Sequence, residues 1–258
     1  MKFTIITVCF NSEKTIRHTI ESVLSQSYKN IEYIVVDGGS KDKTISIIKG
    51  YGNKISKFIS EPDSGIYDAI NKGIKKSSGD FIGILNSDDF FASSNTLEVI
   101  AMTLKKNHAL DLVFSYLDIV QKDNDNKIIR KYRVNKYNKF MMRIGIMPPH
   151  PTFFIKRSIY NSLGENLYRT DMKISADFEL ILRLLLNVNP NYECIPIVSV
   201  IMRSGGISNK SFFSKIKLNK EILNACKINN FYSNFFFLII KFFPRALELI
   251  PFSFWRKN

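Results

Sequence analysis

The segments IEYIVVDGG (residues 31–39), ISKFISEPD (55–63) and GDFIGILNSDD (79–89) decide the fold, because each runs a short apolar stretch into carboxylates. The apolar stretches are rich in Ile, Val and Phe, and helix-like segments separate them. Such runs are typical of buried parallel strands that crossover helices connect. The carboxylates then gather beyond the carboxyl ends of the strands, where open α/β sheets bind their ligands.

The carboxylates at these strand ends are Asp37, Asp63, Asp88 and Asp89. Acids at successive strand ends repel one another unless a cation or hydrogen-bond donors gather there. Asp37 alone fits a turn or helix cap equally well. Asp88 and Asp89 are adjacent and cannot both cap one helix, so their oxygens favour a divalent metal. The pattern therefore predicts a nucleotide and metal site.

The alternation of strands and helices continues on both sides of these segments and predicts an α/β fold with a mainly parallel, doubly wound sheet and helices on both faces. Residues 147–151, with two prolines and a histidine, predict an ordered loop. The strands are expected at 3–10, 31–36, 55–59, 81–85, 112–117, 128–134 (antiparallel) and 193–202, and the helices at 12–26, from 43, 64–76, 95–106 and 175–187.

The 258 residues suit one α/β domain with a modest appendage, and they carry a net charge of +14. From Arg203 onward ten Lys or Arg face only Glu221 and Glu248, and residues 122–143 are also basic. Such patches attract nucleic acid, anionic lipid or phosphorylated substrates.

The cysteines and the first residues of the chain bear on its compartment. Cys9, Cys194 and Cys226 are far apart and lack metal spacing, which favours reduced thiols and the cytoplasm. The start of the sequence has no secretion signal, and no apolar run reaches the roughly 18 residues needed to span a bilayer. We expect a cytoplasmic protein.

Seven motifs stand out along the chain: TVCFN (7–11), VVDGGSKDKT (35–44), EPDSGIYDAINKG (61–73), LNSDD (85–89), PHPTFFIKRSIYNSLG (149–164), SADFELILRL (175–184) and GGIS (205–208). Together they resemble the inverting nucleotide-sugar transferases of glycosyltransferase family 2, and above all bacterial enzymes that build surface polysaccharide such as O-antigen or capsule. The resemblance implies a GT-A fold, with a catalytic domain at 1–208 that divides into a nucleotide-sugar half (1–118) and an acceptor half (119–208). A helical, basic and aromatic extension follows at 209–258.

The resemblance assigns the nucleoside pocket to the first three strand ends. Asp37 is expected to accept the uracil N–H, while Gly38 lets the backbone approach the base. Asp63 joins this pocket, and Lys72 approaches the diphosphate, although a solvated helix face is an equal alternative. The end of the first strand lines the same pocket with Thr7, Phe10 and Asn11.

The family's metal motif is an acid, a spacer and a second acid, and here Asn86 takes the first place. The resemblance then assigns Asp89 to the metal and Asp88 to the metal or the ribose, with Asn86 beside them. Oxygen ligands together with a diphosphate suit Mg²⁺ or Mn²⁺, which would offset the charge on the departing UDP.

The resemblance assigns the general base to an acid at the start of a late helix, here Asp177. An N-terminal helix charge is the alternative for this residue. Glu179 is expected to bind the acceptor. Arg183 either contacts phosphate or Asp177 or forms an ordinary helix ion pair. His150 is expected in the cleft on the diphosphate, the metal or the acceptor.

The expected partners are a UDP-sugar donor and a lipid-linked saccharide acceptor at the inner face of the cell membrane. The aromatic and basic segment 231–255 fits an interfacial helix pair, or a helix packed on the catalytic domain. Two other classes fit less well. A nucleic-acid-binding protein would not need acids at each strand end. A Rossmann oxidoreductase would carry a glycine fingerprint that CFNSEKT (9–15) lacks.

Overall fold

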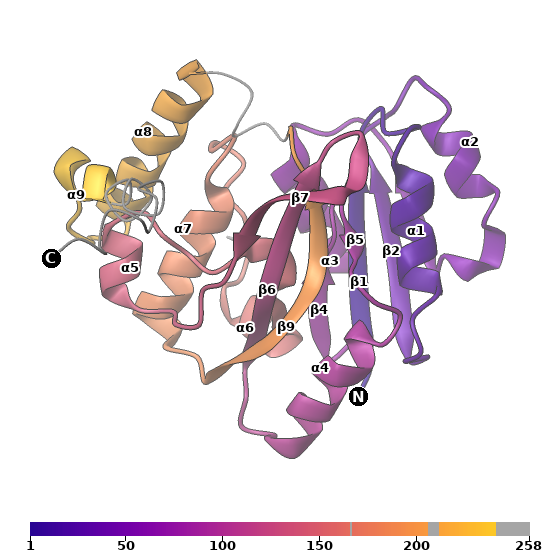
Figure 1. Ribbon diagram of the computed structural model, residues 1–258, viewed down its shortest axis with the longest axis horizontal. Coiled ribbons are helices and arrows are strands. Elements are labelled where there is room, and N and C mark those ends of the chain that lie inside the picture. The colour runs from indigo at the N-terminus through magenta and orange to yellow at the C-terminus, as the bar shows by residue number, and fades with distance from the viewer. Residues whose placement is uncertain (166, 206–211, 241–258) are drawn as a thin grey trace, which may run out of the picture.

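The computed structural model describes residues 1–165, 167–205 and 212–240. Within these residues one nine-stranded sheet runs in the order β3-β2-β1-β4-β8-β6-β9-β5, and β7 pairs with β6 (Figure 1). The strands are β1 Phe3–Cys9, β2 Ile31–Asp37, β3 Lys57–Ser60, β4 Phe81–Ile84, β5 Phe90–Phe91, β6 Leu112–Gln121, β7 Asn124–Tyr132, β8 Phe154–Lys156 and β9 Tyr192–Arg203. The helices are α1 Ile16–Leu24, α2 Thr44–Lys49, α3 Ile66–Lys76, α4 Thr96–Lys106, α5 Lys139–Arg143, α6 Arg157–Ser162, α7 Ala176–Arg183, α8 Phe212–Ile228 and α9 Phe235–Ile240, with short 3-10 turns at Gly52–Lys54 and His150–Thr152 and a π turn at Leu184–Val188.

The first half of the sheet is parallel, as the apolar runs predict. β1 pairs with β2 and β4, and β2 pairs with β3, all in parallel. The register sets Cys9 opposite Asp37 and Asp37 opposite Ser60, so these strands end at one edge. The loops that carry the predicted site residues therefore start from neighbouring positions.

The second half of the sheet is mixed. β8 lies antiparallel between β4 and β6, β9 runs parallel to β6, and β5 and β7 add antiparallel edges. The α/β fold with helices on both faces is confirmed, and the antiparallel strand expected at 128–134 is β7 at 124–132. The two or three residues of β5 and β8 are too short to show a period, so the sequence did not predict them.

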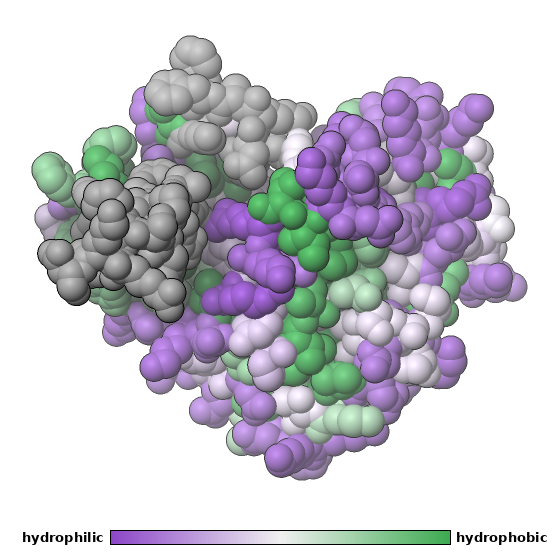
Figure 2. All heavy atoms as spheres, in the orientation of Figure 1, coloured by the Kyte–Doolittle hydropathy of each residue, from purple (hydrophilic) through white to green (hydrophobic). Residues whose placement is uncertain are grey.

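Both faces of the sheet are covered, because the side chains of each strand alternate between them. Ile6 and Val8 of β1 join the apolar cluster that α3, α7 and α8 complete. Ile5 and Cys9 join a second cluster with residues of α1, α2 and α4. On the face drawn in Figure 2, hydrophilic side chains dominate around α1 and α2, and a strip of apolar surface runs down the middle.

The C-terminal helices α8 and α9 gather beside α7 at one side of the sheet (Figure 1). Phe231 and Leu238 are buried in the cluster of α7 and α8, whereas Phe235 and Phe236 are 59 % and 82 % exposed. The rest of the tail, 241–258, and most of the GGIS loop lie outside the described residues. In the part of the chain that is described, no helix is long and apolar enough to cross a membrane.

Candidate active site

The loops that follow β1, β2 and β4 are tied together at the carboxyl edge of the parallel strands. The hydroxyl oxygens of Ser12 and Ser87 lie 2.8 Å apart. The Asn11 amide donates to Ser40 Oγ, and the Lys41 amide donates to Asn11 Oδ1, both at 2.8 Å. Asn11 adopts a φ of +48°, a left-handed conformation that Asn tolerates better than most residues. These contacts fix the floor of the candidate site.

Asp37 is fully buried, and both of its carboxylate oxygens already have protein donors. Oδ2 accepts from the amides of Gly39 and Ser40 at 3.1 Å and from the Ser60 hydroxyl at 2.8 Å. Oδ1 accepts from the Ser40 hydroxyl. The carboxylate thus closes the turn after β2, and the expectation that Asp37 grips the uracil ring stays a prediction.

The Asp63 carboxylate lies beside the same turn, against Gly38. The carboxylate lies so close to Gly38 that a Cβ added there would collide with Oδ2. Oδ1 accepts from the Gly65 amide at 2.9 Å, and Oδ2 has no hydrogen-bond partner among the described residues. Gly38 thus makes room for the Asp63 carboxylate, which is half-buried and keeps a free oxygen.

Thr7 and Phe10, both predicted to line the nucleoside pocket, lie in different surroundings. Thr7 is fully buried, and its Oγ1 accepts from the Tyr33 hydroxyl at 3.1 Å, so it belongs to the core and not to an open pocket. Phe10, at the end of β1, is 60 % exposed. Of these two side chains, only Phe10 is free to meet a ligand.

Lys72 on α3 is held by its own loop. Its Nζ lies 2.9 Å from Glu61 Oε1 and 3.5 Å from Asp68 Oδ2, and it donates to the Pro62 carbonyl at 3.2 Å. The hydrogen bond to Glu61 is the main cause that raises the pKa of Lys72. The Lys72 side chain therefore ties the 61–65 loop to α3. The sequence suggested two other surroundings for it, a diphosphate contact and a solvated helix face.

The turn 86–89 holds the two adjacent acids. Asp89 is 1 % exposed, its Oδ2 accepts weakly from Asn86 Nδ2 at 3.3 Å, and its Oδ1 is buried with no hydrogen-bond partner among the described residues. Burial, and next the charge of Asp88, raise the pKa of Asp89 well above its ordinary value. Burial also raises the pKa of Asp88. The Thr19 hydroxyl, 2.7 Å from the Asp89 carbonyl, anchors the turn to α1.

These two acids fit a divalent cation. Buried polar oxygens normally have a partner, and a cation would be a partner for Asp89 Oδ1. A cation would also offset the repulsion between the two adjacent carboxylates. No cluster of three or more His, Cys, Asp or Glu side chains is placed to hold a metal within the described ranges. Asp88 and Asp89, with Asn86 beside them, would therefore share the cation with oxygens from a bound phosphate or water.

Arg203, at the end of β9, adds a buried positive charge that the sequence reasoning missed. Its Nη1 donates to the Asp88 carbonyl at 3.0 Å, and Nε donates to Asp125 Oδ1 at 2.7 Å. The guanidinium lies 4.8 Å from the ring centre of Phe90. The only signal in the sequence was a basic residue two positions before the GG of the GGIS motif.

Asp177 lies in the first turn of α7, and His150 lies beside it. Asp177 Oδ2 is 2.8 Å from His150 Nδ1. Oδ1 accepts from the Phe178 amide at 2.8 Å and from the Tyr67 hydroxyl at 3.4 Å. Burial, and next the Asp177 charge, raise the pKa of Tyr67, which keeps its hydroxyl protonated as a donor. The structure thus brings together two residues that the sequence singled out separately.

The Asp177 group is tied to the strand-end loops by two contacts. Tyr67 opens α3 directly after the 61–65 loop, and Lys173 Nζ donates to the Ser64 carbonyl at 3.2 Å. Glu221 of α8 accepts from the amide of Ser175 at 2.9 Å and so holds the start of α7. The carboxylate of Asp177 is therefore positioned next to the loop that carries Asp63.

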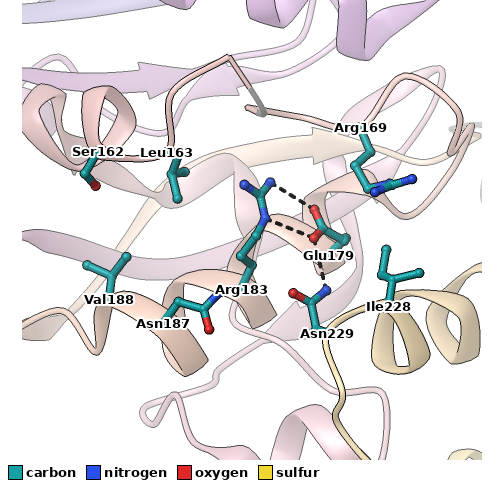
Figure 3. Close-up of a pocket in the computed structure, with 9 residues that line it drawn as sticks. All are labelled: Ser162, Leu163, Arg169, Glu179, Arg183, Asn187, Val188, Ile228 and Asn229. Carbon is teal, nitrogen blue, oxygen red and sulfur yellow. Dashed lines mark hydrogen bonds and ion pairs between the residues drawn. The ribbon is translucent and has the colours of Figure 1, made fainter.

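Glu179 points away from Asp177, because two residues along a helix turn the side chain by about 200°. Arg183 lies one turn beyond Glu179 on the same face. Arg183 Nε donates to Glu179 Oε1 at 3.0 Å, and Asn229 Nδ2 donates to the same oxygen (Figure 3). This is the ordinary helix ion pair, so Glu179 and Arg183 are not beside the expected base. With seven other residues they line a separate cavity of about 760 Å³: Ser162, Leu163, Arg169, Asn187, Val188, Ile228 and Asn229.

Comparison with known proteins decides the family. The model of the family described as Glycosyl transferase family 2 matches residues 4–164, which is more than half of the chain. The chain belongs to this family. An uncharacterized glycosyltransferase of Mycobacterium tuberculosis is 30 % identical over 191 residues, covering 72 % of this chain and 70 % of the relative. The resemblance to glycosyltransferase family 2 is confirmed.

Two further similarities extend over most of this family 2 chain. A PGL/p-HBAD biosynthesis glycosyltransferase of Mycobacterium bovis is 23 % identical over 229 residues, covering 85 % of this chain and 86 % of the relative. The crystal structure of residues 1–349 of S. aureus TarS has a TM-score of 0.64 at 20 % identity, and the match covers 88 % of this chain and 72 % of that 1–349 chain. At that identity the TarS structure shows the GT-A fold alone. TarS has also been solved with UDP and with UDP-GlcNAc.

Proposed function

We propose that the protein is an inverting glycosyltransferase that moves a sugar from a UDP-sugar to a saccharide acceptor. One observation carries the proposal: Asp63, Asp88 and Asp89 occupy one edge of the parallel strands, and Asp177 is linked to that edge through the Tyr67 hydroxyl. Asp63 and Asp89 each keep an oxygen that has no hydrogen-bond partner among the described residues. The first three acids suit a nucleotide with its cation, and the fourth, with His150 beside it, suits the removal of a proton.

The donor is a uridine nucleotide in this proposal. The complexes of TarS with UDP and UDP-GlcNAc support that nucleotide class. We assign the uracil N–H to the free Oδ2 of Asp63 and not to Asp37, whose oxygens have internal donors. The exposed ring of Phe10 is available to stack on the base.

Asp88 and Asp89 would hold Mg²⁺ or Mn²⁺ together with the diphosphate. The cation supplies positive charge against the leaving UDP when it is bound. Arg203 contributes from the protein itself, because its guanidinium contacts the carbonyl of Asp88 and is only 8 % exposed. It holds the turn that carries both acids in place.

The base is built on Asp177. In a single displacement the acceptor hydroxyl loses its proton as its oxygen attacks the anomeric carbon from the face opposite UDP, so the anomeric configuration inverts. One basic site is sufficient for this reaction. The Phe178 amide and the Tyr67 hydroxyl both donate to the Asp177 carboxylate and hold it in place.

The acceptor is a lipid-linked saccharide in this proposal, in the synthesis of bacterial surface polysaccharide, and the protein works as a peripheral protein at the inner face of the membrane. The exposed Tyr232, Phe235 and Phe236 around the start of α9 support a membrane contact, since aromatic side chains suit the headgroup region. Lys220 and Lys227 on the neighbouring α8 add positive charge for anionic lipid.

Thermal melting with candidate ligands tests the proposed donor. UDP together with Mn²⁺ should raise the melting temperature, because a ligand that binds only the folded state stabilises it by linkage. NAD and a short oligonucleotide serve as matched controls for the oxidoreductase and nucleic-acid alternatives. A shift with NAD or the oligonucleotide, and none with UDP and Mn²⁺, would overturn the proposal.

A further inference from the structure

We propose that His150 is the group that takes the proton from the acceptor hydroxyl, with Asp177 behind it as the residue that orients the imidazole. The inference rests on the proposed glycosyl transfer and names a second residue of the same site. His150 Nδ1 and Asp177 Oδ2 lie 2.8 Å apart, and the inference follows from the solvent exposure and the hydrogen bonds of these two side chains.

The carboxylate of Asp177 is enclosed. Its side chain is only 10 % exposed, and each oxygen already has a partner. Oδ1 accepts from the Phe178 amide and the Tyr67 hydroxyl, and Oδ2 faces His150. An acceptor hydroxyl could reach this carboxylate only by displacing one of these groups, and a displaced buried partner would lose its hydrogen bond.

The imidazole of His150 is the open member of the pair. Its side chain is 38 % exposed, and Nε2 has no partner within the described residues. In a neutral imidazole one nitrogen donates and the other accepts, and the hydrogen bond at one fixes the role of the other. The carboxylate of Asp177 accepts a hydrogen bond from the N–H at Nδ1. The lone pair of the neutral imidazole is therefore on Nε2.

Hydrogen bonds of Thr152 fix the backbone that carries His150. His150 opens the short 3-10 turn His150–Thr152 between two prolines, Pro149 and Pro151. The Thr152 hydroxyl is fully buried, accepts from the Ser115 amide at 3.1 Å and lies 2.8 Å from the Pro149 carbonyl. These contacts join the turn to β6, so the backbone that carries the imidazole is rigid. Proton transfer in a defined direction requires such a rigid support.

The transfer balances with these two residues. The acceptor O–H bond breaks and its proton goes to His150 Nε2, while the oxygen forms a bond to the anomeric carbon of the donor sugar. The bond from that carbon to the UDP oxygen breaks, and its electron pair leaves with UDP. The imidazolium that results lies against the negative charge of Asp177, which stabilises it.

The first test compares His150→Gln and Asp177→Asn in a UDP-release assay with the UDP-sugar and acceptor that the wild type uses. The inference predicts that His150→Gln lowers kcat by about 10² to 10⁴-fold, at least as much as Asp177→Asn, with KM for the donor little changed. The double variant should be no slower than His150→Gln alone, because the two residues act as one unit. His108→Gln, an exposed histidine on another surface, is the matched control.

Imidazole in the buffer separates the roles of the two residues. His150→Ala should regain part of its transfer rate as imidazole is added, and the double variant with Asp177→Asn should regain less, since its carboxylate no longer orients the base. If His150→Gln transfers at close to the wild-type rate while Asp177→Asn does not, then Asp177 takes the proton itself and the inference is wrong. Failure of the proposed function has a different signature, which is no transfer by the wild type from any nucleotide sugar.

Discussion

Asp63 lies against the backbone of Gly38, at a distance that leaves no room for a Cβ on that residue. The loop after β3 thereby brings a half-buried carboxylate to the turn that follows β2. The Asp37 carboxylate next to this turn is occupied by the amides of Gly39 and Ser40. Two neighbouring acids thus have separate tasks, one structural and one open to a ligand.

This division predicts opposite effects of substitution at the two acids. Asp63→Ala should weaken UDP binding by about 10- to 100-fold, because the base N–H would lose its acceptor, and should leave the melting temperature nearly unchanged. Asp37→Asn should lower the free energy of unfolding by about 1–3 kcal/mol, since two amides and two hydroxyls lose a charged acceptor. Calorimetric titration with UDP beside thermal melting measures both. Normal UDP affinity in Asp63→Ala would exclude this residue from the nucleoside pocket.

Asp89→Asn should lower metal-dependent transfer by at least about 100-fold, because the leaving diphosphate would lose the cation that offsets its charge. The same variant should melt in EDTA at the wild-type temperature or above it. Its amide removes a buried oxygen that has no partner, on a group whose pKa burial raises well above the ordinary value. Asp123→Asn, an exposed acid at the β6–β7 turn, is the control. Full wild-type activity in EDTA would contradict the metal assignment.

Glu32 predicts a pH dependence of stability. Burial opposes its ionisation, but hydrogen bonds from Lys57, Thr4 and Ser78 outweigh burial and lower its pKa from 4.5 to about 2. Since the folded-state pKa is the lower one, Glu32 stabilises the fold fully above about pH 4.5, and this contribution is lost as the pH falls toward 2. Glu32→Gln should therefore unfold more easily at pH 7 by about 1–3 kcal/mol.

The difference between Glu32→Gln and the wild type should shrink as melting is repeated from pH 5 down to pH 2.5. Glu193→Gln, an exposed acid on β9, should show no such trend. A difference that stays constant over this pH range would mean that folding does not lower the pKa of Glu32.

The start of α9 predicts membrane binding through its exposed aromatic residues. The double variant Phe235→Ser and Phe236→Ser should lose sedimentation with anionic phosphatidylglycerol vesicles, because both rings are exposed and would otherwise be buried among headgroups. It should keep its melting temperature, because the buried Phe231 and Leu238 are untouched. Met102→Ser, an exposed apolar residue on α4, is the control. Unchanged vesicle binding by the double variant would support the packed-helix alternative for this segment.

The sequence predicts the parallel half of this fold well, and the reason is local. The runs at Ile31–Asp37 and Phe81–Ile84 carry apolar side chains on both faces. Such a pattern is typical of a strand whose two faces are both covered by helices. β8 is different, because its three residues enter the sheet between β4 and β6 through contacts with strands distant in the sequence. No local pattern encodes such a position.

The candidate site shows the same limit at the level of side chains. The acids at the strand ends are visible as a pattern, but which of Asp37 and Asp63 keeps a free oxygen depends on the donors that the fold brings to each. The contact between His150 and Asp177 joins residues 27 positions apart, on a turn and on a helix. Residue types indicated both members, and only the folded structure pairs them.

One measurement tests the central claim most directly. The wild type and Asp177→Asn are incubated with Mn²⁺, a panel of UDP-sugars and a diphosphate-lipid sugar acceptor, and the products are read by mass. We expect the wild type to add one sugar residue to the acceptor with release of one UDP, and Asp177→Asn to do so about 10² to 10⁴ times more slowly. Transfer by Asp177→Asn at the wild-type rate, or no transfer by the folded wild type from any UDP-sugar, would contradict this account.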